Sequence, residues 1–144
     1  MSAPDPESLL RITLRQGTVY YFQHRELSSE LPHYFIVMNA HAAADEILLM
    51  VVVTSNLAGV RQRCAGLPGT WVEITPKEYS ELTMLSAVDC NQVIRISRIQ
   101  IIEKIRCREI GYKDDLPDAI MEKLINAVLS SPKIEETIKT NIRR

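Results

Sequence analysis

Three small polar residues directly follow the most apolar stretch of the chain. Thr54, Ser55 and Asn56 come after seven consecutive apolar residues, Ile47 to Val53. Hydroxyl groups held at the end of a rigid strand can donate hydrogen bonds to a phosphoryl oxygen as negative charge develops on it. The same residue types also form ordinary turns, so a turn without a chemical role is the competing interpretation.

His33 is the histidine whose position favours a chemical role. It opens an aromatic and β-branched segment, residues 33–39, which we expect to pair with the strand that ends at Thr54. Depending on the register, its imidazole can approach the threonine hydroxyl, and an imidazole that titrates near neutrality can act as acid or base in phosphodiester cleavage. A solvated loop histidine is the plainer interpretation, and we apply it to His24 and His41.

A local cluster of positive charge follows the hydroxyl pair. Residues 57–69 contain three glycines, a proline, Arg61 and Arg63, which predicts a loop. Guanidinium groups bind phosphates well, so these two arginines are candidate RNA contacts. Such a cluster matters because the whole chain has a formal net charge of only −1, which gives no general attraction to nucleic acid or membrane.

The composition indicates one ordinary globular domain of 144 residues. The N-terminus lacks the pattern of a secretion signal, and no apolar run reaches membrane length. The three cysteines lack metal-ligand spacing and are typical of reduced thiols in a cytoplasmic protein. We find no paired metal-binding histidines and no glycine-rich phosphate loop, so we expect neither a metal nor a cofactor.

The positions of these residues depend on a predicted β structure. The run Ile47 to Val53 is too short for a membrane span, and its β-branched content predicts a buried strand. A short connection joins it to residues 34–38, which predicts an antiparallel hairpin. We expect two strand-like pieces in residues 9–22, a short strand at 71–74 and one or two strands in 86–105. No helix is expected before Asp115, which favours a small barrel over about 9–110.

The period of the apolar pattern changes at the C-terminus, over residues 115–144. Asp115 is the expected helix cap, with Pro117 near the helix start, and Ser131 with Pro132 ends that helix. The apolar residues that recur at helical spacing are Leu116, Ala119, Ile120, Leu124, Ala127 and Val128. A second helix carries an apolar stripe of Ile134, Ile138 and Ile142, which packs either on its own barrel or on a second copy.

Five segments, in this order and spacing, resemble the MazF/PemK (Kid) family of toxin endoribonucleases between about Leu14 and about Leu129. They are Gly17-Thr-Val-Tyr-Tyr, Pro32-His-Tyr-Phe-Ile-Val-Met-Asn, Val51-Val-Val-Thr-Ser, Ser86-Ala-Val-Asp-Cys-Asn-Gln-Val and Arg108-Glu-Ile-Gly. The resemblance implies an SH3-like barrel, a homodimer, cleavage of single-stranded RNA without metal to leave a cyclic phosphate, and a cognate antitoxin. The family's hydroxyl position corresponds to Thr54, and in the Kid branch its neighbour corresponds to Ser55.

The chain departs from the family at three positions. His33 stands where the family commonly has an arginine, while Asp89 and Asn91 stand where the Kid branch has arginine and aspartate around a cysteine. Two functions therefore remain open. One is an endoribonuclease toxin that uses Thr54, Ser55 and His33; the other is a non-catalytic barrel that binds protein or RNA.

Overall fold

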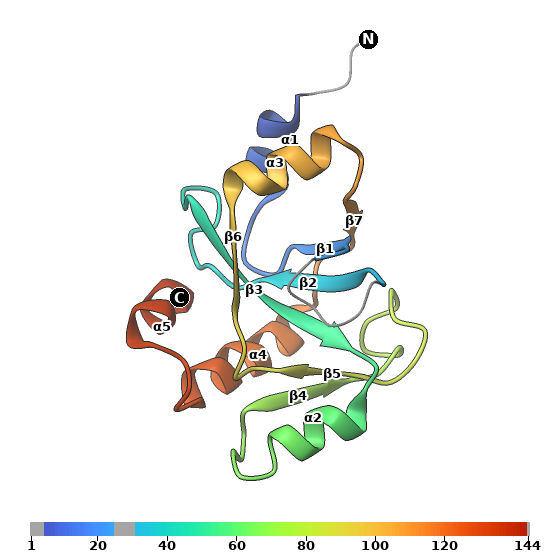
Figure 1. The fold of residues 1–144 in the computed structure, drawn as a ribbon, viewed down its shortest axis with the longest axis vertical. Helices are drawn as coiled ribbons and strands as arrows, with labels where there is room; N and C mark the ends of the chain where they lie inside the picture. The colour runs from blue at the N-terminus through green and yellow to red at the C-terminus, as the bar shows by residue number, and fades with distance from the viewer. Residues whose placement is uncertain (1–4, 25–30, 144) are drawn as a thin grey trace.

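Seven antiparallel strands form the centre of the protein (Figure 1). The computed structural model describes residues 5–24 and 31–143. Within them the strands are β1 (Val19–Phe22), β2 (His33–Val37), β3 (Ile47–Thr54), β4 (Trp71–Ile74), β5 (Ser86–Asp89), β6 (Ile94–Ser97) and β7 (Gly111–Lys113). The mainly β character that the sequence predicts is thus confirmed.

Strand β3 lies at the centre of this sheet. One edge of it pairs with β2, with Tyr34 opposite Val53 and Val37 opposite Met50, as the predicted hairpin requires. Its other edge is shared, because the first half pairs with β6 and the last two residues pair with β5. Residues 48–51 and 53 are buried. The apolar run is therefore a largely buried central strand, as the sequence predicts.

The strands do not close into the barrel that the sequence predicts. In the described residues the sheet runs in the order β4-β5-β3-β2-β1-β7, with β6 beside β3, so β4 and β7 are its outer strands. Closure requires the two outer strands to pair. Here β7 has three residues and pairs with β1, while the helix that follows it in sequence packs against β4.

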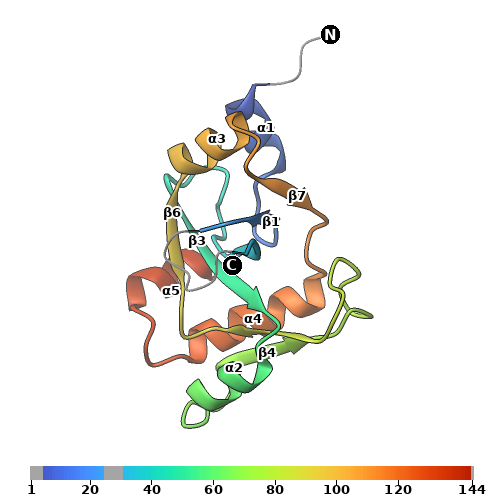
Figure 2. The same cartoon turned by 45° about the vertical axis from the view of Figure 1, so that its right-hand side comes forward.

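Five helices surround the sheet in the described part of the chain: α1 (Pro6–Thr13), α2 (Leu57–Arg63), α3 (Arg98–Arg106), α4 (Asp118–Ser130) and α5 (Glu136–Ile142). Figure 2 shows α1 and α3 side by side at one end of the molecule, far from α2. The expectation of no helix before Asp115 was wrong, and so were a strand over the residues of α1 and a loop over those of α2. Residues 86–105 contain the expected strands, β5 and β6, but end in α3.

Local capping explains where these early helices begin. The Asp5 carboxylate accepts a hydrogen bond from the backbone of Ser8, and Pro6 occupies the first turn of α1. Asn56 caps α2 by accepting from the backbone of Gly59. Ser97 and Gln100 bond reciprocally in a capping box at the start of α3. Each helix starts where the sequence supplies a side-chain acceptor.

The C-terminal helices match the predicted change of period, with one correction. Helix α4 has Pro117 at its N-cap and no side-chain cap, because the Asp115 carboxylate forms an ion pair with Arg15 instead. Ser131 ends α4 as expected. The stripe of Ile134, Ile138 and Ile142 is buried within this chain. It is therefore not an exposed surface for a second copy.

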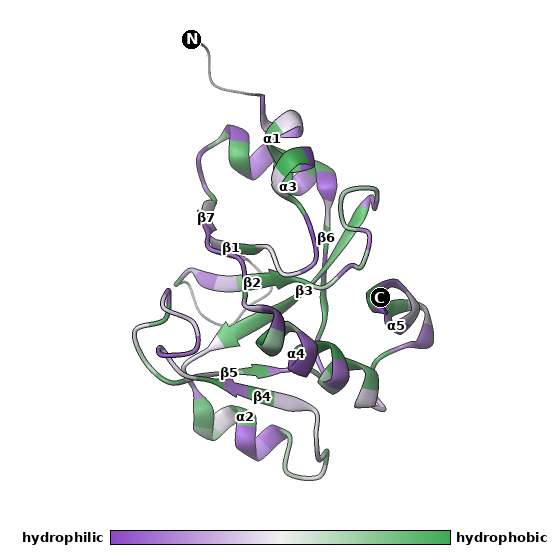
Figure 3. Cartoon of the chain, turned by 180° about the vertical axis from the view of Figure 1, so that it is seen from behind, coloured by the Kyte–Doolittle hydropathy of each residue, from purple (hydrophilic) through white to green (hydrophobic). Residues whose placement is uncertain are grey.

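Each face of the sheet has its own hydrophobic core, and hydrophobic residues run along much of β3 (Figure 3). One core joins alternate strand residues such as Ile36 and Val51 to α4 and α5. The other joins Phe35 and Met50 to α1 and α3. Among the described residues, no helix is long and apolar enough to cross a membrane.

Candidate functional site

A hollow of about 430 Å³ lies where β2 begins and β3 ends. It is lined by three of the five residues singled out from the sequence, His33, Thr54 and Ser55, together with Asn56 and Ser86. Its remaining walls come from Tyr21 on β1, residues 31–32, Tyr34, Val53 and residues 82–84. The fold therefore brings the predicted imidazole and the predicted hydroxyls to one surface depression.

The register of the central hairpin sets His33 across from Thr54. Tyr34 pairs with Val53, so one further step along both strands places the histidine opposite the threonine. Directly opposite side chains on neighbouring antiparallel strands have Cβ atoms within about 5.5 Å. Both residues are half-buried. The imidazole and the hydroxyl are thus cross-strand neighbours.

The His33 ring is only partly engaged by the protein. Its Nδ1 atom is buried and has no hydrogen-bond partner among residues 5–24 and 31–143. A buried polar nitrogen without a partner is costly unless a ligand or solvent satisfies it. This buried nitrogen sets His33 apart from the other residues that line the hollow.

The segment after β3 is both a turn and a source of hydroxyl groups. Thr54 Oγ1 accepts a hydrogen bond from the Asn56 backbone at 3.1 Å, and Asn56 in turn caps α2. Ser55 is exposed between them. The segment is therefore a bend that leads into the cap of α2, and Thr54 and Ser55 also line the hollow.

Two tyrosines that the sequence interpretation missed also line the hollow, and strand alternation places them on the sheet face opposite to His33 and Thr54. The Tyr21 and Tyr34 rings lie 4.8 Å apart between centroids, with their planes inclined by 40°. The Tyr34 hydroxyl donates to the Glu81 carbonyl at 3.0 Å, and burial together with nearby Tyr21 raises its pKa. In sequence both residues read only as strand formers, and their pairing depends on the β1–β2 register.

Arg61 and Arg63 lie on α2 and do not line this hollow. Arg61 donates two hydrogen bonds to the Glu73 carboxylate, at 2.9 and 2.8 Å, and this pairing raises the pKa of Arg61 and lowers that of Glu73. Arg63 contacts Asp89 at 3.3 Å. Both guanidinium groups therefore already have carboxylate partners.

Asp89 and Asn91, the positions that depart from the Kid branch, belong to a buried polar cluster. The Asn91 amide donates to Asp89 and to Thr70 Oγ1, both at 2.9 Å, and Cys64 Sγ contacts Asp89 at 3.4 Å. Burial and the neighbouring Asp89 carboxylate raise the pKa of the Cys64 thiol. These side chains hold α2, β4 and the β5–β6 turn together, and none of them lines the hollow at His33.

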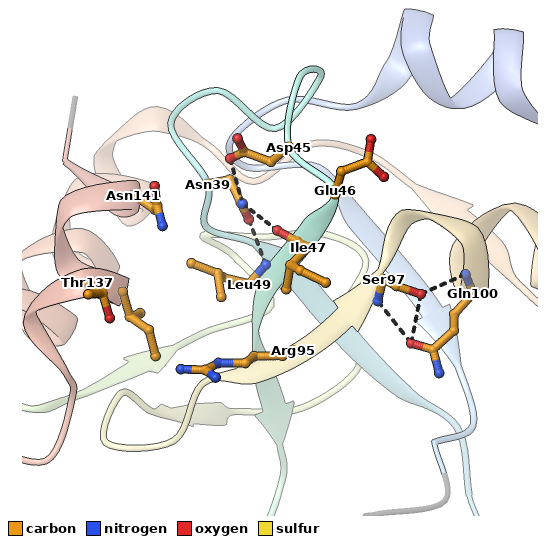
Figure 4. Close-up of a pocket in the computed structure, with 11 residues that line it drawn as sticks. Asn39, Asp45, Glu46, Ile47, Leu49, Arg95, Ser97, Gln100, Thr137 and Asn141 are labelled. Atoms are coloured by element: carbon orange, nitrogen blue, oxygen red, sulfur yellow. Dashed lines mark hydrogen bonds between the residues drawn. The ribbon is translucent and has the colours of Figure 1, made fainter.

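A second depression, of about 570 Å³, lies between β3, β6 and α5 (Figure 4). At its edge, the Asn39 amide donates to Asp45 Oδ2 and to the Ile47 carbonyl, and its oxygen accepts from the Leu49 backbone. Figure 4 shows these bonds and the Ser97–Gln100 capping pair. These polar groups serve the fold, so the depression at His33 is the better candidate for chemistry.

A metal site is not apparent in the described residues. No group of three or more histidine, cysteine, aspartate or glutamate side chains within residues 5–24 and 31–143 is placed to hold a metal ion. The groups that the hollow offers to a ligand are an imidazole, hydroxyls, an amide and aromatic rings. Such groups bind and polarise a phosphate and move protons.

The fold is similar to that of a solved endoribonuclease. The chain is similar to a solved structure described as an endoribonuclease in complex with its cognate antitoxin from mycobacterial species, with a TM-score of 0.54 and 16% sequence identity. The match covers 85% of this chain and 97% of the other. A comparison of the sequence with protein-family models and with curated proteins finds no match. At this identity the similarity establishes the shared fold.

Proposed function

We propose that this chain is a MazF/PemK-type endoribonuclease toxin that cleaves single-stranded RNA in the cytoplasm without a metal ion. The observation that carries the proposal is the position of His33 across from Thr54, in a hollow that also includes Ser55. The sequence resemblance and the toxin-like fold support it independently.

The reaction that suits these groups is attack by a ribose 2′-hydroxyl on the adjacent phosphate. The 2′-oxygen forms a bond to phosphorus and the bond from phosphorus to the 5′-oxygen breaks, which leaves a cyclic phosphate and a 5′-hydroxyl. One proton leaves the 2′-hydroxyl and one reaches the 5′-oxygen. In the proposal His33 carries one of these protons, while Thr54 and Ser55 donate hydrogen bonds to the phosphoryl oxygen.

The proposal extends to partners and assembly. A cognate antitoxin would cover the hollow, and two copies of the chain would form a homodimer with a deeper RNA groove. Arg61 and Arg63 would contact flanking phosphates, in competition with Glu73 and Asp89. Light scattering at micromolar concentration tests the dimer, and a mass equal to one chain would contradict it.

The second candidate function is a non-catalytic binding module on the same fold. It is favoured by the buried cluster at Asp89 and Asn91, because these side chains hold the structure together and do not line the hollow. A module of this kind would bind RNA or protein without breaking a phosphodiester bond.

Cleavage of a mixed-sequence single-stranded RNA in the presence of EDTA separates the two functions. We expect products that end in a cyclic phosphate, and we expect no such products from the matched His33→Ala protein. RNA that stays intact with the folded wild-type protein would favour the binding module. Growth arrest after induced expression provides an independent test, since a harmless module would accumulate.

A further inference from the structure

Another hollow, of about 770 Å³, adjoins the candidate site on the side of α3 and β7; we call it the α3–β7 hollow. Tyr21 and Pro32 line both hollows, so the two hollows are neighbours on the surface. Its far wall is formed by Lys104 at the end of α3 and by Arg108 and Glu109 in the turn that follows. Neither the fold similarity nor the proposed chemistry assigns a role to this wall.

The cations along this surface differ from the arginines of α2. Lys104 Nζ lies 5.3 Å from the centroid of the Phe22 ring, and Lys113 Nζ lies 5.4 Å from that of Tyr21. Unlike Arg61 and Arg63, the side chains of Lys104, Arg108 and Lys113 make no ion pair with any carboxylate in the described ranges. The hollow itself is lined by two cations, Lys104 and Arg108, and one carboxylate, Glu109, which leaves a net positive charge. Lys113 lies outside this lining, over Tyr21.

Arg108 occupies a backbone position that glycine would fill more easily. Its φ is 57°, and it is the only non-glycine residue with positive φ among the described residues. The Arg108 backbone donates to the Ile105 carbonyl and the Glu109 backbone to the Lys104 carbonyl, at 3.1 and 2.9 Å. These two bonds form a Schellman motif, whose left-handed residue is usually glycine. Arg108 therefore adopts a left-handed backbone conformation that glycine adopts more easily.

We propose that the α3–β7 hollow binds the single-stranded RNA that flanks the cleaved phosphate. Lys104 and Arg108, which line this hollow, contact the phosphates beyond the cleaved one. The inference rests on the proposed function, which defines the cleaved phosphate from which the flanking RNA extends. It assigns the contacts with flanking phosphates to residues at the end of α3 and in the turn before β7, and not chiefly to the arginines of α2.

The closing experiment measures binding without cleavage. A fluorescent 2′-O-methyl oligoribonucleotide lacks the attacking hydroxyl, so its affinity reports binding alone. Arg108→Gly removes the cation but suits the backbone. We expect this variant to unfold at the same or a higher temperature than the wild type. Its affinity should fall by roughly 3–10-fold, and the slope of log affinity against log salt should decrease by about 0.7.

Arg106→Ala is the matched control, because it removes one arginine from the same helix, where Arg106 is paired with Glu103 at 2.6 Å. It should leave the affinity nearly unchanged. Lys104→Gln gives a second measurement that does not alter the Schellman turn, and it should weaken binding as Arg108→Gly does.

The outcomes separate the two proposals. Wild-type affinity in both Arg108→Gly and Lys104→Gln, or an equal loss in Arg106→Ala, would overturn the flanking site whatever the cleavage assay shows. Failure of the wild-type protein to bind the oligonucleotide would overturn it as well. Salt-dependent binding that requires Arg108, in a protein that leaves RNA intact, would support this site and refute the nuclease.

Discussion

Ser131 donates a hydrogen bond to Asn91 Oδ1 at 2.6 Å, which ties the end of α4 to the β5–β6 turn. Ser131 is fully buried, and Asn91 also bonds to Asp89 and Thr70. The asparagine that replaces a charged residue of the Kid branch is thus the centre of a structural cluster. The site at His33 depends on this cluster only through the strands that it holds in place.

Ser131→Ala should lower the free energy of unfolding by roughly 1–3 kcal/mol, because it leaves the Asn91 oxygen without its donor in a buried setting. Urea denaturation measures the change. Ser130→Ala is the control, since Ser130 is exposed at the preceding position of the same helix. Equal midpoints for the two variants would show that the bond contributes nothing.

The Asp89 carboxylate should make the fold sensitive to acid. Burial acts to raise its pKa, but hydrogen bonds from Asn91, Cys64 and Arg63 outweigh burial and hold the pKa below its usual value. A lowered folded-state pKa contributes stability above the unfolded-state pKa of about 4, and that contribution is lost as the pH falls through the folded value. In Asp89→Asn the unfolding free energy should depend less steeply on pH below about 4. A slope equal to that of the wild type would contradict this assignment.

Truncation of the central strand should be costly. Leu48 and Leu49 are 0% and 4% exposed, one in each core, so Leu48→Ala and Leu49→Ala should each lose about 2–5 kcal/mol of unfolding free energy. Ile47→Ala provides the comparison, because Ile47 is 47% exposed on the same strand. Thermal unfolding that stays unchanged in both leucine variants would remove β3 from the centre of the fold.

Substitutions in the candidate site should reduce RNA cleavage without unfolding the protein. Thr54→Ala should reduce RNA cleavage by roughly 10²–10³-fold through loss of an oxyanion donor, and His33→Ala by roughly 10²–10⁴-fold. His41→Ala, at an exposed histidine outside the hollow, should cleave like the wild type. If the wild type is inactive and His33→Arg gains cleavage, the native hollow is a binding site whose catalytic residue has been replaced.

Arg63→Ala should affect stability more than RNA binding, because its carboxylate partner Asp89 is largely buried and would lose a donor. We expect a lower urea midpoint and a loss of oligonucleotide affinity smaller than that of Arg108→Gly. A larger loss of affinity in Arg63→Ala, with an unchanged midpoint, would return the main phosphate contact to α2.

The sequence alone determined the elements whose signals are local. The unbroken apolar run identifies β3, the short connection identifies its hairpin with β2, and helical spacing followed by Ser131 and Pro132 identifies α4 and its end. These patterns are sufficient because burial on both faces of a strand, or on one face of a helix, is encoded by neighbouring residues.

The tertiary structure decided what depends on distant contacts. Helix α1 reads as a strand because Leu9 and Leu10 precede the branched pair Ile12 and Thr13, yet burial of Leu10 against the sheet and capping by Asp5 stabilise a helix. Short helices are marginal by propensity, so packing determines them. Similarly, the open sheet follows from how β6 and β5 share one edge of β3, a long-range pairing that no local pattern specifies.

The candidate site divides in the same way. The sequence supplied the histidine and the hydroxyls, but only the register sets His33 across from Thr54. It also supplied Arg61 and Arg63, whose carboxylate partners lie 12 and 26 residues away in the chain. Which cations remain unpaired beside the hollow is a property of three-dimensional pairing. Among the described residues, the fold places Lys104 and Arg108 beside it, at the end of α3 and in the turn that follows.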